Sequence, residues 1–467
     1  MLISNLIKIK NNSNQTNEFG KNVYIHRNGD YMILRDKYLN LLIKSKQNGY
    51  PKVITGIRRC GKSYLLDTIY KQYLIDSGIP SQNIISLDLT KISNAKYRDP
   101  IYLYEHILKL TSNKKEFYYV ILDEIQEVYS IINPALTDGK HVVATSKDKD
   151  IITFVDVVLD LSSIKNIDLY ITGSNSKMLS TDIATQFRDK ATNIRVMPLS
   201  FEEVYKYENK DENLLINNYM LYGGMPLAIL KDGIDKENYL KDLFETTYFK
   251  DIIDRNKIKK REALDEICTM LATCVGDLIN SQRIANLYRT KTKNKIDSDT
   301  VNSYINSFID SFILSEAFRY DLKGKNIITS TKKYYYIDTG LRNARLNFIY
   351  SDTGKLLENV IYNELIYNDY KVNVGTFDFF EKDADRKTIR KTLEVDFLAV
   401  KGNKMYYIQV CDDYSNETTK NRKLKPYIAL NDQIQKIIVI NRPIKEMRDE
   451  KGFTIIGVCD FLLRFIK

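Results

Sequence analysis

The stretch that decides the fold spans Pro51 to Leu66 and reads PKVITGIRRCGKSYLL. A short apolar run leads to Gly56, and helical apolar spacing begins after Ser63. The residues between them follow the pattern G-x-x-x-x-G-K-[ST], which belongs in the turn between a strand and a helix. Glycine lets successive backbone N–H groups curl around an anion, and the helix N-terminus adds partial positive charge at the same place. The sequence therefore predicts a phosphate-binding loop.

The polar side chains of this loop indicate its ligand. Lys62 is placed to reach the β- and γ-phosphates of a nucleotide, and the Ser63 hydroxyl to complete the coordination of Mg²⁺. ATP and Mg are therefore the expected cofactors. The residues expected to surround the nucleotide are Gly56, Ile57, Arg58, Arg59, Cys60, Gly61, Lys62, Ser63 and Tyr64.

Two later strands are predicted to end in the side chains that hydrolysis needs. Residues 117–124 form an apolar run that ends in Asp123 and Glu124. A Mg²⁺ ion bound to phosphates needs an acidic ligand there, which points to Asp123, and Glu124 would polarise the attacking water as general base. Residues 167–172 form another strand, followed by Asn175, which we interpret as a sensor of the γ-phosphate or, alternatively, a turn residue.

Strands and helices alternate around these motifs as in a doubly wound α/β sheet. Helices are expected at residues 34–46, from the loop to Ser77 and from Phe154, with a strand at 83–89 and a polar insertion loop at 129–150. All three polar motifs fall at the carboxyl ends of strands, where ligands bind such sheets.

Composition excludes several classes of protein. The chain has 467 residues with a net charge of +10, and a soft division by about 150 residues suggests roughly three domains. No apolar run approaches the roughly 20 residues of a membrane span, and the N-terminus has too short an apolar core for a signal peptide. We therefore expect a cytoplasmic protein with no membrane partner. Five scattered cysteines and three distant histidines give no credible zinc site.

Five motifs follow one another along the chain: GIRRCGKS (56–63), LDEIQE (122–127), TGSNSK (172–177), PLSF (198–201) and YGGMP (222–226). In this order they resemble a widespread prokaryotic family of AAA-type ATP-binding proteins, related to archaeal ATPases of the STAND-like branch. The resemblance covers nearly the whole chain after the first 30 residues. It implies an AAA-type P-loop NTPase with a parallel sheet, then a winged helix, then an α/β restriction-endonuclease-like domain.

The resemblance also assigns a further arginine. The family usually shows an Arg-Gly-Arg-like turn before PLSF, whereas residues 187–190 read FRDK here. Arg188 is therefore a candidate contact to the γ-phosphate, with Asp189 at a position that is normally glycine. The alternative is a surface arginine on a loop of mixed charge.

We predict four segments from these observations. They are an N-terminal arm (1–30), a P-loop ATPase domain with its lid (31–255), a winged helix (256–338) and a restriction-endonuclease-like domain (339–467). The third segment has three helical patterns and a hairpin pattern, and cations lie between its second and third helices, where they could meet DNA phosphates. These cations are Arg289, Lys291, Lys293 and Lys295. Winged helices also bind proteins, so the expected partner is DNA or a protein.

The last segment resembles a metal-dependent nuclease with one motif changed. Glu358 on a helix and Asp396 on a strand match the carboxylates of such a site, which hold Mg²⁺. The third motif, [DE]-x-Lys, reads Gln409-Val-Cys here, so an amide replaces a carboxylate and the lysine is absent. This favours a degenerate nuclease site, unless Lys404 or Lys420 substitutes.

The sequence thus predicts an ATPase in which Lys62, Glu124, Asn175 and Arg188 are catalytic, coupled to a regulatory or DNA-related role. One alternative is a DNA nuclease regulated by ATP, for which defence against foreign DNA is one biological role. Another is a nucleotide-gated switch that does not hydrolyse ATP. Whether the chain forms a homo-oligomer is left open.

Overall fold

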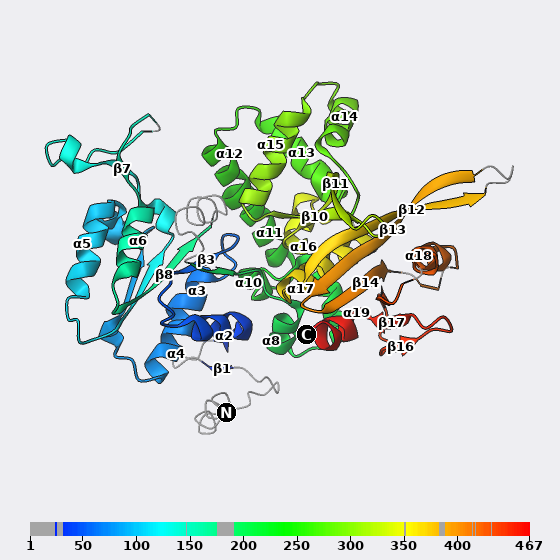
Figure 1. Cartoon of the computed structure of the whole chain (residues 1–467), viewed down its shortest axis with the longest axis horizontal. Helices are drawn as coiled ribbons and strands as arrows, with labels where there is room; N and C mark the ends of the chain where they lie inside the picture. The colour runs from blue at the N-terminus through cyan, green and yellow to red at the C-terminus, as the bar shows by residue number, and fades with distance from the viewer. Residues whose placement is uncertain are drawn as a thin grey trace.

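The computed structural model in Figure 1 describes residues 33–145, 147–174, 191–349, 352–382, 388–412, 414–415, 417–430 and 432–467. It also places two short strands, β1 (Tyr24–Ile25) and β2 (Tyr31–Met32). No helix among these residues is long and apolar enough to cross a bilayer.

The N-terminal part is built on a parallel sheet. Within the described residues it has five strands in the order β4-β5-β8-β3-β9. Their bounds are β3 (Lys52–Thr55), β4 (Ile84–Asp88), β5 (Tyr118–Asp123), β8 (Ile167–Gly173) and β9 (Thr192–Arg195). All neighbouring pairs are parallel, which confirms the predicted α/β fold class for this part.

Helices cover both faces of this sheet because consecutive residues of its central strands are buried and successive side chains point to opposite faces. In β5, Val120 packs with the core under α5 (Pro100–Leu110) and α6 (Phe154–Ser163), whereas Ile121 faces the opposite core. That opposite core contains α2 (Asp36–Ser45) and the helical segment after the loop. This segment runs through α3 (Lys62–Tyr64), a π-helical stretch (Leu65–Tyr70) and α4 (Lys71–Asp76). The predicted helices at 34–46, 62–77 and 154–161 therefore form where expected.

The segment predicted as a polar insertion loop contains a small strand pair. The strands β6 (Ile131–Ile132) and β7 (Ile151–Ile152) are antiparallel and form a sheet of their own. In Figure 1 this excursion extends away from the main sheet.

A helical region follows the sheet. It comprises α8 (Phe201–Glu208), α9 (Glu212–Tyr222), α10 (Pro226–Ile229), α11 (Gly233–Asp242), a π-helical stretch (Leu243–Phe249) and α12 (Lys250–Asn256). Ser200 caps α8, because its side chain accepts from the N–H of Glu203 while the Glu203 carboxylate accepts from the N–H of Ser200. The last three of these segments follow one another without a break from Gly233 to Asn256.

Three helices and a hairpin come next, in the order expected of a winged helix. The helices are α13 (Arg261–Thr273), α14 (Ser281–Thr292) and α15 (Ser298–Asp310), and the antiparallel hairpin consists of β10 (Leu314–Asp321) and β11 (Asn326–Tyr336). The three helices lie together above the middle of the molecule in Figure 1. The identification as a winged helix stays a prediction.

The C-terminal part is a mixed sheet with helices on it. Its described strands are β12 (Lys371–Lys382), β13 (Thr388–Lys401), β14 (Lys404–Cys411), β15 (Gln435–Ile440), β16 (Met447–Arg448) and β17 (Thr454–Gly457). Its helices are α16 (Thr339–Arg345), α17 (Thr353–Tyr367), α18 (Glu417–Ala429) and α19 (Val458–Asp460). The strands β13 and β14 form an antiparallel hairpin, with Lys401 paired to Lys404.

The sheet of the C-terminal part also includes the two hairpin strands of the third predicted segment. Its strand order is β11-β10-β12-β13-β14-β15-β17-β16, so the hairpin of the three-helix unit and the C-terminal strands form one eight-stranded sheet. The junction is a parallel pairing between β10 and β12, in which Tyr320 faces Gly375. The three-helix unit is therefore joined to the C-terminal part through a continuous hydrogen-bonded sheet.

A buried carboxylate links the C-terminal part to the ATPase helices. Glu364 on α17 is 3% exposed and accepts from the backbone N–H of Phe201 at 2.7 Å and from the Tyr219 hydroxyl at 3.1 Å. Burial raises the pKa of Glu364 to about 7, although these two donors partly offset the effect. The carboxyl group is therefore about half protonated near pH 7.

This raised pKa predicts how stability depends on pH. An unfolded glutamate titrates near about 4.3, so between about pH 4.3 and about 7 the folded chain binds the proton more tightly, and the free energy of unfolding falls as pH rises. Glu364→Gln keeps an oxygen acceptor but cannot ionise. We expect the variant to lose less stability than the wild type between pH 5 and pH 8, by on the order of 2 kcal/mol in urea unfolding. Equal losses in both proteins would contradict this.

Candidate functional site

The phosphate loop lies between β3 and α3, as the sequence predicts. Gly56 has φ 147°, and a Cβ there would lie 2.1 Å from the carbonyl oxygen of Val196. Gly61 has φ 97°, the left-handed region that favours glycine. Only glycine therefore fits at Gly56 without moving the backbone.

Lys62 lies across this loop and faces the end of β5. Its side chain is 3% exposed, and Nζ donates to the carbonyl oxygens of Gly56 at 2.9 Å and Ile57 at 3.3 Å. The same Nζ is 4.0 Å from Oε1 of Glu124. The structure thus brings together the predicted phosphate-binding lysine and the predicted general base.

Thr172 on β8 bonds the carboxylate of Asp123 and the backbone of Glu124 at the end of β5. The Thr172 hydroxyl donates to Oδ1 of Asp123 and accepts from the N–H of Glu124 at 2.9 Å. Glu124 has φ 55°, which is uncommon for a residue with a side chain, and Gln126 donates to its Oε2. Thr172 is fully buried and its role escaped the sequence-based prediction, which placed only an apolar strand there.

Asp123 and Ser63 fit a magnesium ion. Asp123 is 4% exposed, and burial raises its pKa while the hydroxyls of Thr172 and Ser63 oppose the rise. A carboxylate beside a hydroxyl is the hard oxygen set that Mg²⁺ prefers when phosphates complete its shell. The described residues contain no group of three or more His, Cys, Asp or Glu side chains arranged for a metal, so an ion here would depend on the nucleotide.

Two arginines meet beside these carboxylates. Arg58 in the loop donates from Nε to the Ser174 hydroxyl at 3.2 Å, and its Nη1 is 3.1 Å from Oδ1 of Asp251. Arg255 donates from Nη2 to the same hydroxyl at 3.3 Å and lies 3.1 Å from Oδ2 of Asp251. The sequence-based analysis missed Ser174, Asp251 and Arg255. The i, i+4 spacing of Asp251 and Arg255 was visible, but nothing local showed that their helix reaches the loop.

The remaining loop residues have different roles. Ile57 and Cys60 are buried in the core, with the Cys60 thiol donating to the carbonyl oxygen of Val196, so packing is their visible role. Arg59 is exposed with φ 61°, and Tyr64 is 40% exposed. Asn175 and Arg188 lie outside the described residues, and their predicted roles stay predictions.

A family match decides the class of this site. Residues 48–205 match the AAA domain family, and residues 213–352 match a domain of unknown function (DUF8612). The N-terminal part of this chain is an AAA domain. The match and the parallel sheet confirm the predicted AAA-type P-loop fold and support nucleotide binding in general. Asp251 and Arg255 belong to the second matched range, so the second region contributes side chains at the nucleotide loop of the AAA domain.

Two relatives are similar over most of their length. A protein of Haemophilus influenzae, described as uncharacterized, is 29% identical over 438 residues, which cover 93% of this chain and 99% of that protein. Another uncharacterized protein, from Methanocaldococcus jannaschii, is 29% identical over 427 residues, covering 88% of this chain and 84% of that protein. The similarity therefore extends well beyond the AAA domain.

Among solved structures, CDC6P from Pyrobaculum aerophilum has a TM-score of 0.28 with 12% identity, covering 72% of this chain and 97% of its own. The ORC1 protein of Aeropyrum pernix, solved with DNA, has a TM-score of 0.28 with 11% identity, covering 67% and 91%. Similarity at this level carries no argument about the function of the present chain.

The predicted nuclease residues also lie near one another, and lysine side chains pair with their carboxylates. Glu358 accepts from Lys333 at 3.0 Å and from the Tyr335 hydroxyl at 2.7 Å, and Lys333 is also 2.7 Å from Glu394. The second lysine, Lys423, approaches Oδ2 of Asp396 to 2.5 Å. Lys423 also donates to Oε1 of Gln409 at 3.2 Å.

The expected substitutes for the missing lysine are elsewhere. Lys404 is exposed at the start of β14, and Lys420 pairs with Glu417 at 3.6 Å, so the suggestion that either one enters the cluster is wrong. Lys423 does so because α18 packs against β13 and β14 with this side chain toward Asp396. The sequence could not show which lysine of α18 faces Asp396, because the face of a helix that packs on a sheet is decided only by the tertiary structure.

The charges of this cluster are already balanced by protein groups. Burial opposes the ionisation of Asp396, but Lys423 and Lys333 outweigh it and hold the pKa of Asp396 below its usual value. Burial also opposes the charge of Lys333, and Glu358 and Glu394 overcome it, which raises the lysine pKa. Lys423 places beside Asp396 a lysine that the third motif lacks, whereas Lys333 is a further ammonium group that already pairs with Glu358 and Glu394. The pairing with Lys333 is what argues against a divalent cation here.

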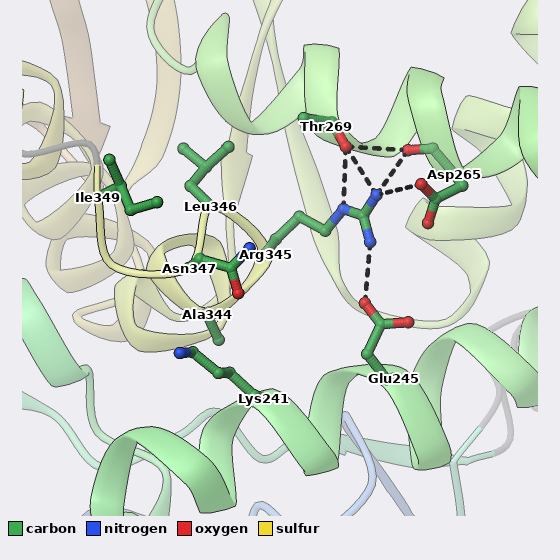
Figure 2. Close-up of a pocket in the computed structure, with 9 residues that line it drawn as sticks. All are labelled: Lys241, Glu245, Asp265, Thr269, Ala344, Arg345, Leu346, Asn347 and Ile349. Atoms are coloured by element: carbon green, nitrogen blue, oxygen red, sulfur yellow. Dashed lines mark hydrogen bonds and ion pairs between the residues drawn. The ribbon is translucent and has the colours of Figure 1, made fainter. Parts of the chain in front are cut away.

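A separate cavity of about 460 Å³ surrounds Arg345 and is shown in Figure 2. The Arg345 guanidinium bonds Glu245 at 2.9 Å, Asp265 at 2.8 Å and Thr269 at 2.7 Å. Burial opposes its charge, but nearby acidic groups outweigh burial and raise its pKa. Since its guanidinium is bonded within the chain, we interpret Arg345 as a connection between the π-helical stretch before α12 and helix α13.

The lysine cluster makes a testable prediction about stability. Lys333→Met would leave Glu358 and Glu394 without their buried partner, and we expect a loss of about 3–5 kcal/mol in urea unfolding. Lys332→Met is the matched control, because this neighbouring lysine pairs with Glu316 at 24% exposure and should cost less than about 1 kcal/mol. Equal losses from the two variants would show that the cluster does not hold the sheet together.

Proposed function

We propose that this protein binds ATP with Mg²⁺ and hydrolyses it to ADP and phosphate, and that the resulting change acts on its C-terminal parts. The observation that carries the proposal is the placement of Glu124 4.0 Å from the buried Nζ of Lys62, with Asp123 beside it on the same strand end. A general base and a phosphate-binding cation in such proximity suit attack on a γ-phosphate.

The residues of the loop would perform distinct parts of this reaction. Backbone N–H groups of the loop and Lys62 would bind the β- and γ-phosphates, and Ser63 and Asp123 would hold the metal. When bound, Mg²⁺ would neutralise part of the negative charge of the phosphates. Glu124 would orient a water molecule and accept its proton as the water oxygen bonds to the γ-phosphorus. The bond to the bridging oxygen breaks, and its electron pair leaves on ADP.

Two substitutions separate binding from hydrolysis. Lys62→Ala should abolish Mg-dependent phosphate release by removing the charge on the phosphates, while Glu124→Gln should retain ATP binding and lose turnover by at least about 100-fold. Lys71→Ala, further along the same helical segment, is the control. Phosphate release and equilibrium binding of a fluorescent ATP analogue provide the readouts. Wild-type turnover in Lys62→Ala would refute the assignment, and tight ATP binding by a wild type that releases no phosphate would indicate a non-hydrolysing switch.

A second function, contact with DNA phosphates, is supported by a basic cavity on the three-helix unit. This cavity of about 490 Å³ lies where the start of α13 meets the α14–α15 connection. Its basic lining residues are Lys259, Lys260, Arg261 and Lys295, and all four are exposed. Of the four cations predicted from the sequence, Lys295 lines the cavity, whereas Lys291 pairs with Glu266 at 2.5 Å. Exposed cations gathered around a hollow suit a phosphate chain. By contrast, the pairing of Lys333 with Glu358 and Glu394 argues against DNA cleavage.

Binding of DNA should depend on these cations and on salt. We expect the triple variant Lys259→Glu, Lys260→Glu and Lys295→Glu to weaken binding of a labelled duplex at least about tenfold at low salt and to flatten the salt dependence. In the control variant, glutamate replaces Lys114 and Lys115, two exposed lysines near the end of α5. If wild-type protein binds no duplex, or the control weakens binding equally, this surface is not a DNA site, and an acidic protein becomes the partner to test.

A further inference from the structure

Lys333 lies where the three-helix unit meets the C-terminal part. It belongs to β11, a hairpin strand of the three-helix unit, and its side chain is 2% exposed. Its Nζ is 3.0 Å from Oε1 of Glu358 on α17 and 2.7 Å from Oε1 of Glu394 on β13. One ammonium group is therefore shared by two carboxylates that come from two elements of the C-terminal part.

The surrounding carboxylates keep this ammonium group positive. Burial opposes the charge of Lys333, but three carboxylates outweigh burial and raise the lysine pKa. These carboxylates belong to Glu358, Glu394 and Asp396. The second lysine of the cluster, Lys423, bonds Asp396 alone among the three. A neutral side chain in place of Lys333 would therefore leave three carboxylates with one ammonium group.

The three-helix unit also covers one side of these carboxylates. Gly276, in the connection between α13 and α14, has φ 77°, and a Cβ there would lie 3.0 Å from Oε1 of Glu358. Lys355 on α17 holds this connection, because its Nζ donates to the carbonyl oxygen of Thr273 at 2.9 Å and to Oδ2 of Asp277 at 3.0 Å. The three-helix unit thus supplies both the cation of the cluster and part of its cover.

We propose that the Lys333 ammonium group takes the place of a metal ion in this cluster, and that the carboxylates bind a divalent cation only when a neutral side chain replaces Lys333. Carboxylate oxygens are the ligands that hard cations prefer. Calcium ions bind them at about 2.3–2.6 Å, so the distances of 2.7 Å and 3.0 Å from Nζ would need only a small contraction. An ammonium group that is part of β11 does not dissociate, so it joins the two units at any metal concentration.

Lys333 and a metal ion would exclude each other at this place. The backbone of Lys333 pairs with Ala317 of β10 and its side chain is buried, so the ammonium group is fixed in the sheet. A divalent cation between the same carboxylates would meet the ammonium charge at short range, where like charges repel strongly. In the part of the chain that the structure describes, no group of three or more Asp, Glu, His or Cys side chains could hold a metal ion. We therefore expect the wild type to join these units without a metal.

Metal binding by the full chain, without nucleotide, tests this proposal. Lys333→Met should bind Tb³⁺ at least about 100-fold more tightly than the wild type, because a unit charge within about 4 Å of the ion has been removed. Terbium luminescence excited through tyrosine is the readout. The chain has no tryptophan, and the Tyr335 hydroxyl lies 2.7 Å from the Glu358 carboxylate. Ca²⁺ should compete with Tb³⁺ and raise the urea midpoint of Lys333→Met, but not that of the wild type.

Three further variants complete the experiment. Lys332→Met should behave as the wild type does, because Lys332 pairs with Glu316 instead. Glu358→Gln in the Lys333→Met background should lose the gained site. The double variant Lys333→Met with Glu394→Gln removes one carboxylate together with the ammonium group, so it leaves less unpaired charge if Lys333→Met alone does not fold. It should still bind Tb³⁺ more tightly than the wild type.

Each outcome supports or refutes the replacement of a metal by Lys333. Equal Tb³⁺ affinities in the wild type and in both Lys333 variants would refute it, and so would a gained site that survives Glu358→Gln. If Lys333→Met is unfolded without metal and folds with Ca²⁺, but not with Na⁺ at the same ionic strength, the proposal is supported. If neither Lys333 variant folds even with Ca²⁺, a metal does not replace the lysine and the proposal fails. Because ATP takes no part, these results are independent of the proposed ATPase.

Discussion

The buried guanidinium of Arg35 is the interaction on which the nucleotide loop and its surroundings depend. It donates to the carbonyl oxygens of Cys60 in the loop at 3.1 Å and of Met197 after β9 at 2.6 Å, and its Nε is 3.0 Å from Glu203. Burial raises the pKa of Glu203, which Arg35 opposes, and the Tyr367 hydroxyl of α17 donates to the same carboxylate. One cation thus ties the loop, helix α8 and the C-terminal part together, and removing it would leave a buried carboxylate without its counter-charge.

The same principle recurs wherever the parts of this chain meet. Glu364 joins α17 to the start of α8, Arg345 joins the helical run before α12 to α13, and Lys333 joins β11 to α17 and β13. Each is a buried or nearly buried ionisable side chain that is satisfied by groups from distant segments. Because an unpaired buried charge costs several kcal/mol, such contacts specify the relative placement of elements more strictly than apolar packing does. These contacts therefore join the part that contains the nucleotide loop to the following parts at defined places.

The lysine cluster supports the prediction that the nuclease site of the C-terminal part is degenerate. A nuclease site of this type needs carboxylates that face a metal, whereas Glu358, Glu394 and Asp396 face the ammonium groups of Lys333 and Lys423. Lys333 comes from the hairpin that precedes the C-terminal strands, so the cluster also joins the two units that share the eight-stranded sheet. We interpret this part as a scaffold for binding, and the AAA domain as the part with catalytic machinery.

The sequence by itself determined the chemistry of the loop. Gly56, Lys62, Asp123 and Glu124 were identified from local spacing, because a phosphate loop and a strand that ends in carboxylates are local patterns, and parallel strands bring their carboxyl ends to one edge. Only the tertiary structure decided which distant side chains complete each cluster. Arg255 reaches the loop, and Lys333 and Lys423 reach the C-terminal carboxylates, because of how helices and strands pack. Periodicity shows which face of an element is buried, but it contains no information on what that face will meet.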